Sequence, residues 1–149
     1  MAKTYRVSFF VRLGNLLATT LVRAGVKIGS IHLLTVRGRK SGEMRTTPVA
    51  VVEQQEKSYL IAPFGVVNWV RNLRAAAGVA TLTRSRRTEV IHAIELGPEE
   101  AALVLRASLR AGGGGAFTHD FLDATVNSSL EDFEREAAFH PVFLVQSAA

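Results

Sequence analysis

Apolar side chains recur with a helical period near the start of the chain and in short, strand-like runs through most of the rest. Between Phe9 and Val22 they return every three or four positions, which predicts an amphipathic helix within a first segment of residues 1–29. Later runs of four to eight apolar or β-branched residues, separated by turn residues, predict strands. These strands are expected at 31–36, 48–53, 58–62, 79–84, 88–95 and 141–146.

Burial is predicted from the same pattern. Every position from Val49 to Val52 is apolar, so both faces of that strand are expected to be covered. Thr81 and Thr83 alternate with apolar neighbours, as in a strand with one face in water. Pro48 has no N–H for a ladder, so we expect it at the first position of its strand.

Three more helices are predicted, over 66–77, 98–110 and 128–137. The first places Trp69 and Leu73 on one face and ends at Gly78, a residue typical of helix C-termini. Ser128 and Glu131 form a capping-box pattern at the start of the last helix. The fold class is therefore α+β: residues 30–149 form a strongly bent sheet or small barrel of mainly antiparallel strands, with helices packed outside.

Composition narrows the range of functions. The 149 residues are 48% hydrophobic and 21% charged, which indicates one folded domain rather than a disordered chain. Cysteine is absent, which excludes disulfide scaffolds, thiol catalysis and cysteine-ligated metals. Arg12 and Arg23 interrupt the most hydrophobic stretch, so we expect no membrane-spanning helix. Residues 1–11 are not followed by a compact apolar run with a small-residue cleavage site, so we expect a cytoplasmic protein without an export signal. The first helix either packs on the domain or lies on an anionic membrane surface.

A basic, glycine-containing segment between the first two strands carries the most specific signal. It reads Gly-Arg-Lys-Ser-Gly-Glu-Met-Arg-Thr-Thr-Pro over residues 38–48. The glycines permit a sharp turn, and the three cations and the hydroxyls are groups that bind phosphate or carboxylate. The formal net charge of +5 also favours an anionic partner. Taken alone, the segment is either an anion site or a solvated basic turn. It is not a P-loop, because Leu34 stands where the first glycine of that motif is required.

This segment resembles the signature of the deazaflavin-dependent nitroreductase family, Gly-Arg-Lys-Ser/Thr-Gly-x-x-Arg-x-x-Pro. Each fixed position is met, from Gly38 to Pro48. A second family motif is similar to Asn68-Trp69 and to Asn72-Leu73-Arg74-Ala75. The resemblance covers the chain from about residue 31 to residue 141 and implies a split β-barrel that binds 8-hydroxy-5-deazaflavin, coenzyme F420.

The resemblance also implies a division of labour along one elongated ligand. Lys40 and Arg45 would hold its phosphate and acidic tail, while Trp69 and Asn72 would support the site from a helix. The ring would perform the hydride transfer itself, so the protein needs to bind, orient and shield it. The cofactor-binding residues implied are Arg39, Lys40, Ser41, Arg45, Thr46, Thr47, Pro48, Ala62, Pro63, Phe64, Gly65, Trp69 and Asn72.

On the substrate side the chain departs from the family. Its tyrosines, Tyr5 and Tyr59, are not near the C-terminus, where family members that reduce nitroimidazoles carry theirs, and Phe64 replaces a common lysine. The substrate-binding candidates are Phe117, His119 and Phe121, which follow a four-glycine tract that is otherwise a loose surface loop. The scattered histidines and carboxylates form no recognisable triad, metal cluster or catalytic pair, so no residue is assigned a catalytic role.

These features favour an oxidoreductase in which reduced coenzyme F420 donates a hydride to an electron-poor acceptor such as an enone, a quinone or a nitroarene. One alternative is a lipid- or fatty-acid-binding protein on the same scaffold. Another is an FMN-dependent split-barrel oxidoreductase, with FMN the less favoured cofactor. Nucleic-acid binding is not expected, because the basic residues lack interleaved aromatic residues. Both a monomer and a homodimer are compatible with the sequence.

Overall fold

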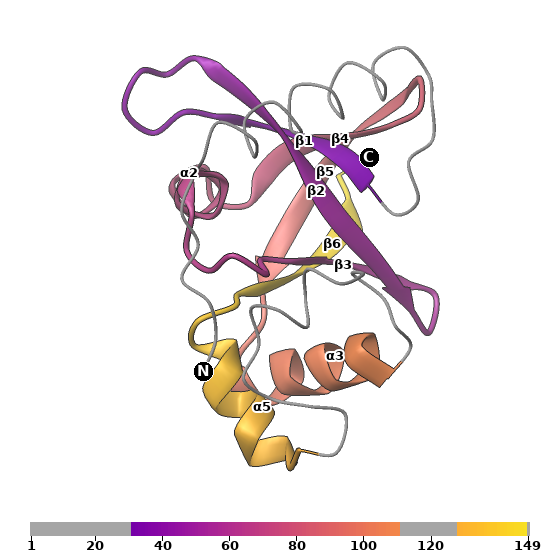
Figure 1. The fold of residues 1–149 in the computed structure, drawn as a ribbon. Coiled ribbons are helices and arrows are strands. Elements are labelled where there is room, and N and C mark those ends of the chain that lie inside the picture. Colours follow the sequence, from indigo (N-terminus) through magenta and orange to yellow (C-terminus); the bar gives the residue numbers. More distant parts are fainter. Residues whose placement is uncertain (1–30, 111–127, 149) are drawn as a thin grey trace, which may run out of the picture.

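The described residues, 31–110 and 128–148 of a computed structural model, form six strands and three helices (Figure 1). The strands are β1 (Ile31–Arg37), β2 (Met44–Gln54), β3 (Lys57–Ile61), β4 (Val79–Arg84), β5 (Arg87–Glu95) and β6 (Val142–Ser147). The helices are α2 (Asn68–Ala75), α3 (Pro98–Arg110) and α5 (Leu130–Ala137). The amphipathic helix expected within 1–29 and the four-glycine tract lie outside the described residues.

The strands close into a barrel in the order β1-β2-β3-β6-β5-β4, and every neighbouring pair is antiparallel. Closure depends on β1, which pairs with β2 on one side and with β4 on the other. A closed barrel leaves no free sheet edge. The expectation of a small antiparallel barrel with helices packed outside is confirmed.

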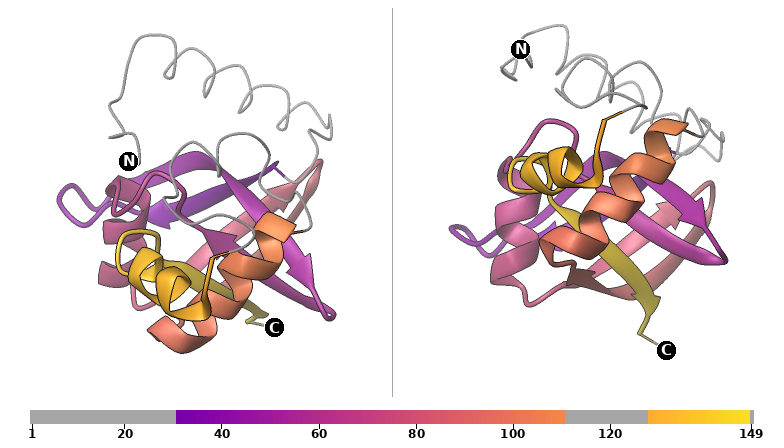
Figure 2. Two further views of the ribbon diagram at one scale, coloured as in Figure 1. Left: turned by 60° about the horizontal axis from the view of Figure 1, so that its bottom comes forward. Right: turned by 90° about the horizontal axis from the view of Figure 1, so that it is seen from below.

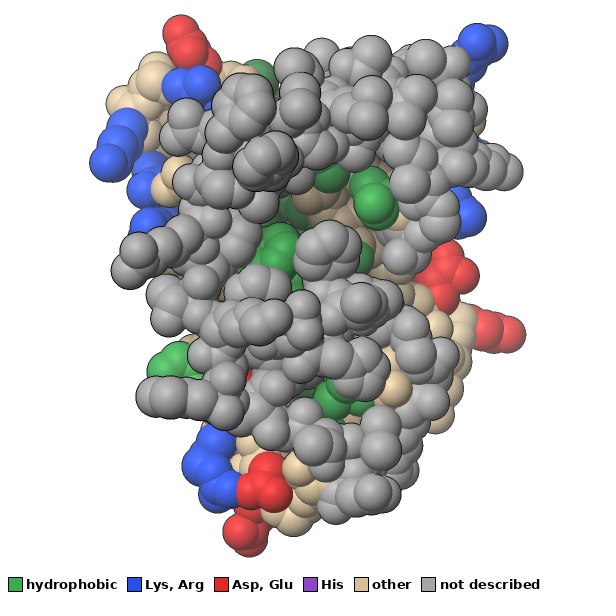
Figure 3. Space-filling model, in the orientation of Figure 1, with side chains coloured by type: hydrophobic (Ala, Val, Ile, Leu, Met, Phe, Trp, Pro, Cys, Tyr) green, Lys and Arg blue, Asp and Glu red, His purple; other side chains and the backbone are tan. Residues whose placement is uncertain are grey.

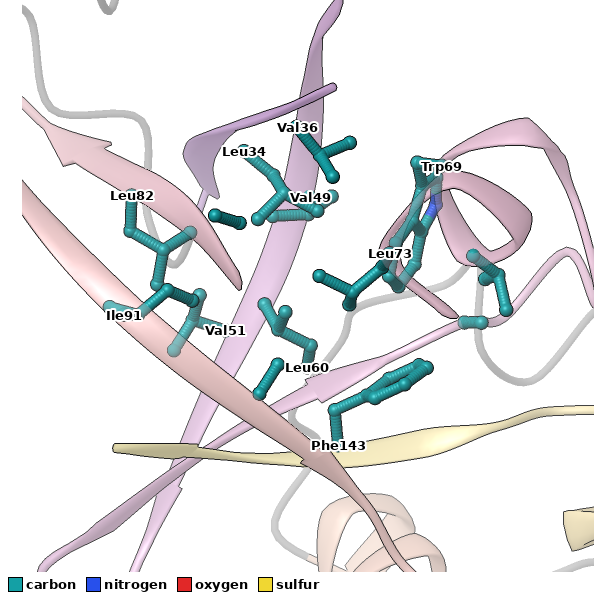
Figure 4. Packing of buried hydrophobic residues seen from close by; sticks show 14 residues of the cluster. Leu34, Val36, Val49, Val51, Leu60, Trp69, Leu73, Leu82, Ile91 and Phe143 are labelled. Atoms are coloured by element: carbon teal, nitrogen blue, oxygen red, sulfur yellow. The ribbon is translucent and has the colours of Figure 1, made fainter. Parts of the chain in front are cut away.

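The barrel interior is filled by inward-pointing apolar side chains from all six strands (Figure 4). Leu34, Leu60 and Ile91 are completely buried there. Trp69, Val70 and Leu73 of α2 join the same cluster, so this helix is anchored to the barrel by its apolar face. Burial of this face fixes the position of the polar side chains on the rest of α2.

A second cluster lies outside the barrel, beneath α3 and α5, which lie side by side in Figures 1 and 2. Phe133 of α5 and Leu105 of α3 are fully buried in it. Val52 and Ile61 face this cluster, while Val51 and Leu60 face the barrel interior. The prediction that the Val49–Val52 run is covered on both faces is therefore confirmed, because helices cover its outer side.

Three local predictions were wrong. β2 begins at Met44, not at Pro48, and Pro48 pairs with Leu33 in mid-strand. This is tolerated because β3 pairs with β2 only from Val51 onward, which leaves the N side of Pro48 without a ladder partner. The N-cap of α5 is Ser129 rather than Ser128, and its capping box closes through Asp132. The left-handed residue that directly follows the C-cap of α2 is Ala77, one position before the expected Gly78.

Candidate anion-binding cavity

The loop between β1 and β2 is closed by its own backbone. Gly38 N–H donates to the Glu43 carbonyl at 2.7 Å, and Gly42 N–H donates to the Gly38 carbonyl at 2.9 Å. A Cβ at position 38 would stand 3.0 Å from the Glu43 oxygen, and Gly42 has a φ of 75°, so both positions favour glycine. The Ser41 hydroxyl accepts from Glu43 N–H at 3.2 Å. The loop is thus a compact turn that carries its long cationic side chains on the outside.

A cavity of about 740 Å³ lies between this loop, the first half of β2 and the polar face of α2. Its wall combines cations, hydroxyls and amides with a smaller apolar part. The lining residues are Val36, Gly38, Arg39, Lys40, Ser41, Met44, Arg45, Thr46, Thr47, Pro48, Asn68, Trp69 and Asn72.

Cations dominate the electrostatics of the cavity. None of the described residues that line it is acidic. Lys40 has no ion pair with any residue of the described part of the chain, and Arg45 has a loose, exposed one, with Nη2 3.5 Å from Glu43 Oε2. Figure 3 shows Lys and Arg side chains gathered at the upper left, over the β1–β2 loop. Surface pairs of this kind are weak, so the positive charge remains available to a ligand.

Arg39 is held against α2 by neutral amides. Its backbone N–H and its Nη1 donate to Asn72 Oδ1, at 3.2 Å and 2.7 Å. Nη2 lies 3.5 Å from Asn68 Oδ1, one helical turn away from Asn72. The guanidinium is therefore oriented by carboxamide oxygens that leave its charge uncompensated.

The floor of the cavity includes Trp69, which is 9% exposed. Its ring is tilted by 52° against that of Phe143, with centroids 6.0 Å apart. The indole thus belongs to the barrel core and also borders the cavity. The hydroxyl groups of Thr46 and Thr35, which face each other across the β1–β2 pair, form a hydrogen bond with their oxygens 2.8 Å apart. Both contacts stiffen the wall.

Nine of the implied cofactor residues come together in this cavity, from all three of its walls. The four residues 62–65 do not line it. Ala62 is buried, and its carbonyl accepts from Gly65 N–H at 3.1 Å in a tight turn that leads into α2. These residues therefore lie next to the elements of the site rather than in its wall. Phe117, His119 and Phe121 lie outside the described residues.

Four lining residues were not assigned from the sequence: Val36, Gly38, Met44 and Asn68. Asn68 carried a usable signal, because it stands four positions before Asn72 and so shares its helix face. Met44 carried no such signal, because the sequence pattern predicts a loop at this position, whereas the structure has Met44 at the start of β2.

Two negative findings concern the described residues. In residues 31–110 and 128–148 no three His, Asp or Glu side chains are grouped as a metal site would require. Within the same ranges no helix has the length and apolarity needed to cross a membrane.

The fold is similar to several solved structures, all at low identity. An F420H2-dependent reductase, FDR-A, is 21% identical, with a TM-score of 0.50 over 78% of this chain and 94% of the other. A structure described as a domain-swapped dimer is 20% identical, with a TM-score of 0.54 over 92% and 97% of the two chains. A protein of unknown function from Agrobacterium tumefaciens is 15% identical, with a TM-score of 0.57, and this chain spans 60% of it. At such identities these likenesses establish the fold alone.

No curated protein matches this chain in sequence. Family membership is decided by a family model instead: residues 14–112, which include the β1–β2 loop and α2, match the F420H2-dependent quinone reductases. The deazaflavin dependence implied by the motifs is thereby confirmed, whereas the nitroreductase label is not. The chain belongs to the F420H2-dependent quinone reductase family and is an oxidoreductase that uses coenzyme F420 as its hydride carrier.

Proposed function

We propose that the cavity between the β1–β2 loop and α2 binds coenzyme F420 and that the protein passes its hydride to a quinone-type acceptor. The observation that carries this proposal is the concentration of Arg39, Lys40 and Arg45 on a cavity whose described lining contains no carboxylate. The coenzyme is an elongated polyanion, with a phosphodiester and a glutamate tail. A wall of cations, hydroxyls and amides fits that end of the molecule.

In this proposal the cations bind and orient the anionic end. Arg39 is fixed by α2, so it offers its remaining N–H groups from one place. Lys40 and Arg45 are exposed and make no hydrogen bond to α2, so they adjust to the phosphodiester and the carboxylates. A hydrogen bond to a charged group contributes about 1.5–3 kcal/mol, so the three side chains together account for much of the affinity.

The ring end is assigned to the other half of the cavity. Thr47 and Pro48 of β2 lie along one side, and Trp69 of α2 forms part of the floor. The mixed polar and apolar wall suits a flat heterocycle with carbonyl groups on one edge. When bound, the reduced ring supplies a hydride, and a proton from water completes the reduction of a quinone to a quinol. Phe117, His119 and Phe121 remain our candidates for contacts with the acceptor.

The test is a binding titration with a charge-matched control. Lys40→Ala combined with Arg45→Ala removes two cavity cations, and we expect the Kd for coenzyme F420 to rise at least fiftyfold. Arg86→Ala combined with Arg87→Ala removes two exposed cations from the β4–β5 turn, at the opposite end of β1. That control should change the Kd by less than threefold. A cavity variant within twofold of the parent protein, or tighter binding of FMN than of coenzyme F420, would contradict the proposal.

A further inference from the structure

The turn between β3 and α2 is held by the segment that joins α5 to β6. Ala62 N–H donates to the Pro141 carbonyl at 3.0 Å, and the Ala62 carbonyl accepts from His140 Nδ1 at 3.3 Å. A Cβ at Gly65, where φ is +86°, would stand 3.1 Å from the Phe139 carbonyl oxygen. Hydrogen bonds and close packing therefore fix the turn to this segment.

The same turn sets where α2 begins. Val67 is the N-cap of α2: its N–H donates to the Gly65 carbonyl at 2.9 Å, and its carbonyl accepts from Val70 N–H at 3.1 Å. The Val67 side chain cannot cap this end of the helix, because it has no polar atom. The backbone of the turn is thus the local support for the first residues of α2, and Asn68 and Trp69 among them line the cavity.

The two ring nitrogens of His140 face two acceptors. Nδ1 faces the Ala62 carbonyl, which can only accept, so Nδ1 carries a proton. Nε2 lies 3.3 Å from Glu136 Oε2. A bare Nε2 and a carboxylate repel each other at this distance, so attraction requires a second proton between them. A doubly protonated ring satisfies both acceptors at once, whereas a neutral ring satisfies only one of them.

The described elements packed around this pair add no further charge. The turn between β3 and α2 and strand β6 carry no acidic or basic side chain. The cluster under α3 and α5 consists of apolar side chains and the phenol of Tyr59. Both members of the pair are buried, with exposed side-chain fractions of 8% for His140 and 10% for Glu136. Loss of the second ring proton therefore sets an acceptor nitrogen against a carboxylate with little solvent to screen them.

We propose that His140 is a positioning residue: its doubly protonated ring holds Ala62 and Glu136 at once and so fixes the start of α2 beside the coenzyme cavity. His140 does not line the cavity, so it acts through the turn. When the second ring proton is lost at higher pH, the ring holds only one partner, α2 is supported less firmly, and coenzyme F420 binds more weakly. This inference rests on the proposed function, because it takes the cavity beside α2 as the coenzyme site.

Glu136→Gln removes the need for the second proton and keeps both contacts. A glutamine amide can donate to a neutral Nε2 while Nδ1 still donates to the Ala62 carbonyl. Glu131→Gln is the matched control, because it removes the same charge from an exposed position on the same helix. His140→Asn is a second variant: its amide lies close to the position of Nδ1, can donate to Ala62, and does not titrate.

Two measurements test the proposal. NMR of the ring nitrogens in the ligand-free protein should show both nitrogens of His140 protonated at neutral pH, and only Nδ1 protonated in Glu136→Gln. The Kd for coenzyme F420 is then measured at pH 6 and pH 9, and variants are compared at each pH, so that the titration of the coenzyme itself cancels. We expect the ratio of the parent Kd to the Glu136→Gln Kd to rise about fivefold or more from pH 6 to pH 9. The ratio to His140→Asn should rise likewise, and the ratio to Glu131→Gln should stay within about twofold.

A neutral His140 ring in the parent protein at neutral pH would overturn the inference. Parent-to-variant ratios that do not change with pH for both Glu136→Gln and His140→Asn would also overturn it, since the ring proton would then have no effect on the site. The Lys40 and Arg45 double variant reports separately on the proposed function. If that variant binds coenzyme F420 normally, the cavity itself has been wrongly assigned, whatever the protonation of His140.

Discussion

His140 Nδ1 lies 3.3 Å from the carbonyl oxygen of Ala62, although 78 residues separate the two in the chain. The carbonyl can only accept, so Nδ1 carries a proton and donates it. Nε2 of the same ring lies 3.3 Å from Glu136 Oε2, and both side chains are buried. This ring joins the C-terminal end of α5 to the turn that leads into α2 and the cavity.

Replacing His140 with alanine removes a buried hydrogen-bonded ring and leaves the Ala62 carbonyl with one donor fewer. We expect the free energy of unfolding to fall by about 2 kcal/mol, measured by urea denaturation. His92→Ala is the control, because its exposed ring makes a comparable 3.2 Å contact with the Ala77 carbonyl. That variant should lose less than about 0.5 kcal/mol, as exposed substitutions usually do. Equal losses of unfolding free energy for the two variants would show that the buried His140 contact stabilises the fold no more than the exposed His92 contact does.

At the C-terminal end of α2, substitutions of two adjacent residues should change the free energy of unfolding in opposite directions. Ala77 has a left-handed φ of 54°, and Gly78 N–H donates to the Leu73 carbonyl at 2.9 Å, as in a Schellman motif. Ala77→Gly should raise the free energy of unfolding by about 0.5–1 kcal/mol, because glycine adopts this conformation without strain.

Gly78→Ala should have the reverse effect, since its Cβ would stand 2.2 Å from the Ala93 carbonyl oxygen at a φ of +82°. We expect a loss of about 2 kcal/mol or more. Thermal unfolding of both variants gives the comparison, and Tm shifts of the same sign would contradict this description of the helix end.

Arg74 and Glu95 form a two-point ion pair between α2 and β5, with both distances at 2.7 Å. The hydrogen bond to Glu95 raises the pKa of Arg74 above its ordinary value. A cation whose pKa is raised on folding stabilises the fold at every pH below its ordinary pKa. This contribution is lost only as the pH rises through the folded-state pKa. The pair should therefore add no pH dependence to stability near neutrality.

Because both side chains of this pair are more than one third exposed, Glu95→Gln should lower the free energy of unfolding by less than about 1 kcal/mol. The loss should shrink further in 1 M salt, where charges are screened within about 3 Å. Urea denaturation at low and high salt measures it. A loss that is independent of salt would show that packing, rather than charge, accounts for the effect.

Phe143 and Phe133 are buried phenylalanines in different clusters, and only Phe143 touches Trp69. Substitution of either by leucine should cost about 1 kcal/mol or more in unfolding free energy. Phe143→Leu should also raise the Kd for coenzyme F420 about three- to tenfold, because it removes the ring that orients Trp69. Phe133→Leu should leave that Kd unchanged. Equal Kd values for the two variants would exclude Trp69 orientation as a factor in binding.

The barrel was predictable because strand length, turn residues and alternating burial are local properties of the chain. The Val49–Val52 run and the Thr81–Thr83 alternation are buried as those patterns indicate. The position of Pro48 was not predictable, because its tolerance depends on where β3 stops pairing with β2. The exact cap of α5 was missed for a smaller reason: Ser128 and Ser129 are both good caps, and the one that faces Asp132 is decided by the backbone path.

The candidate site, like the fold, could be predicted from the sequence only in part. Its cationic loop is contiguous in the sequence, so residue type and spacing were sufficient to single it out, and the family resemblance favoured an anion site over a solvated turn. The link from Arg39 to Asn72 spans 33 residues and depends on how α2 packs on the barrel, which no local pattern contains. The family resemblance implied that the 62–65 turn binds the cofactor, but its residues lie outside the cavity wall.

A crystal structure of the protein with bound coenzyme F420 tests the central claim most directly. The account predicts that the phosphodiester lies against Arg39, Lys40 and Arg45, with the deazaflavin ring toward Pro48 and Trp69. A phosphodiester found elsewhere, for example on the exposed arginines of the β4–β5 turn, would contradict it.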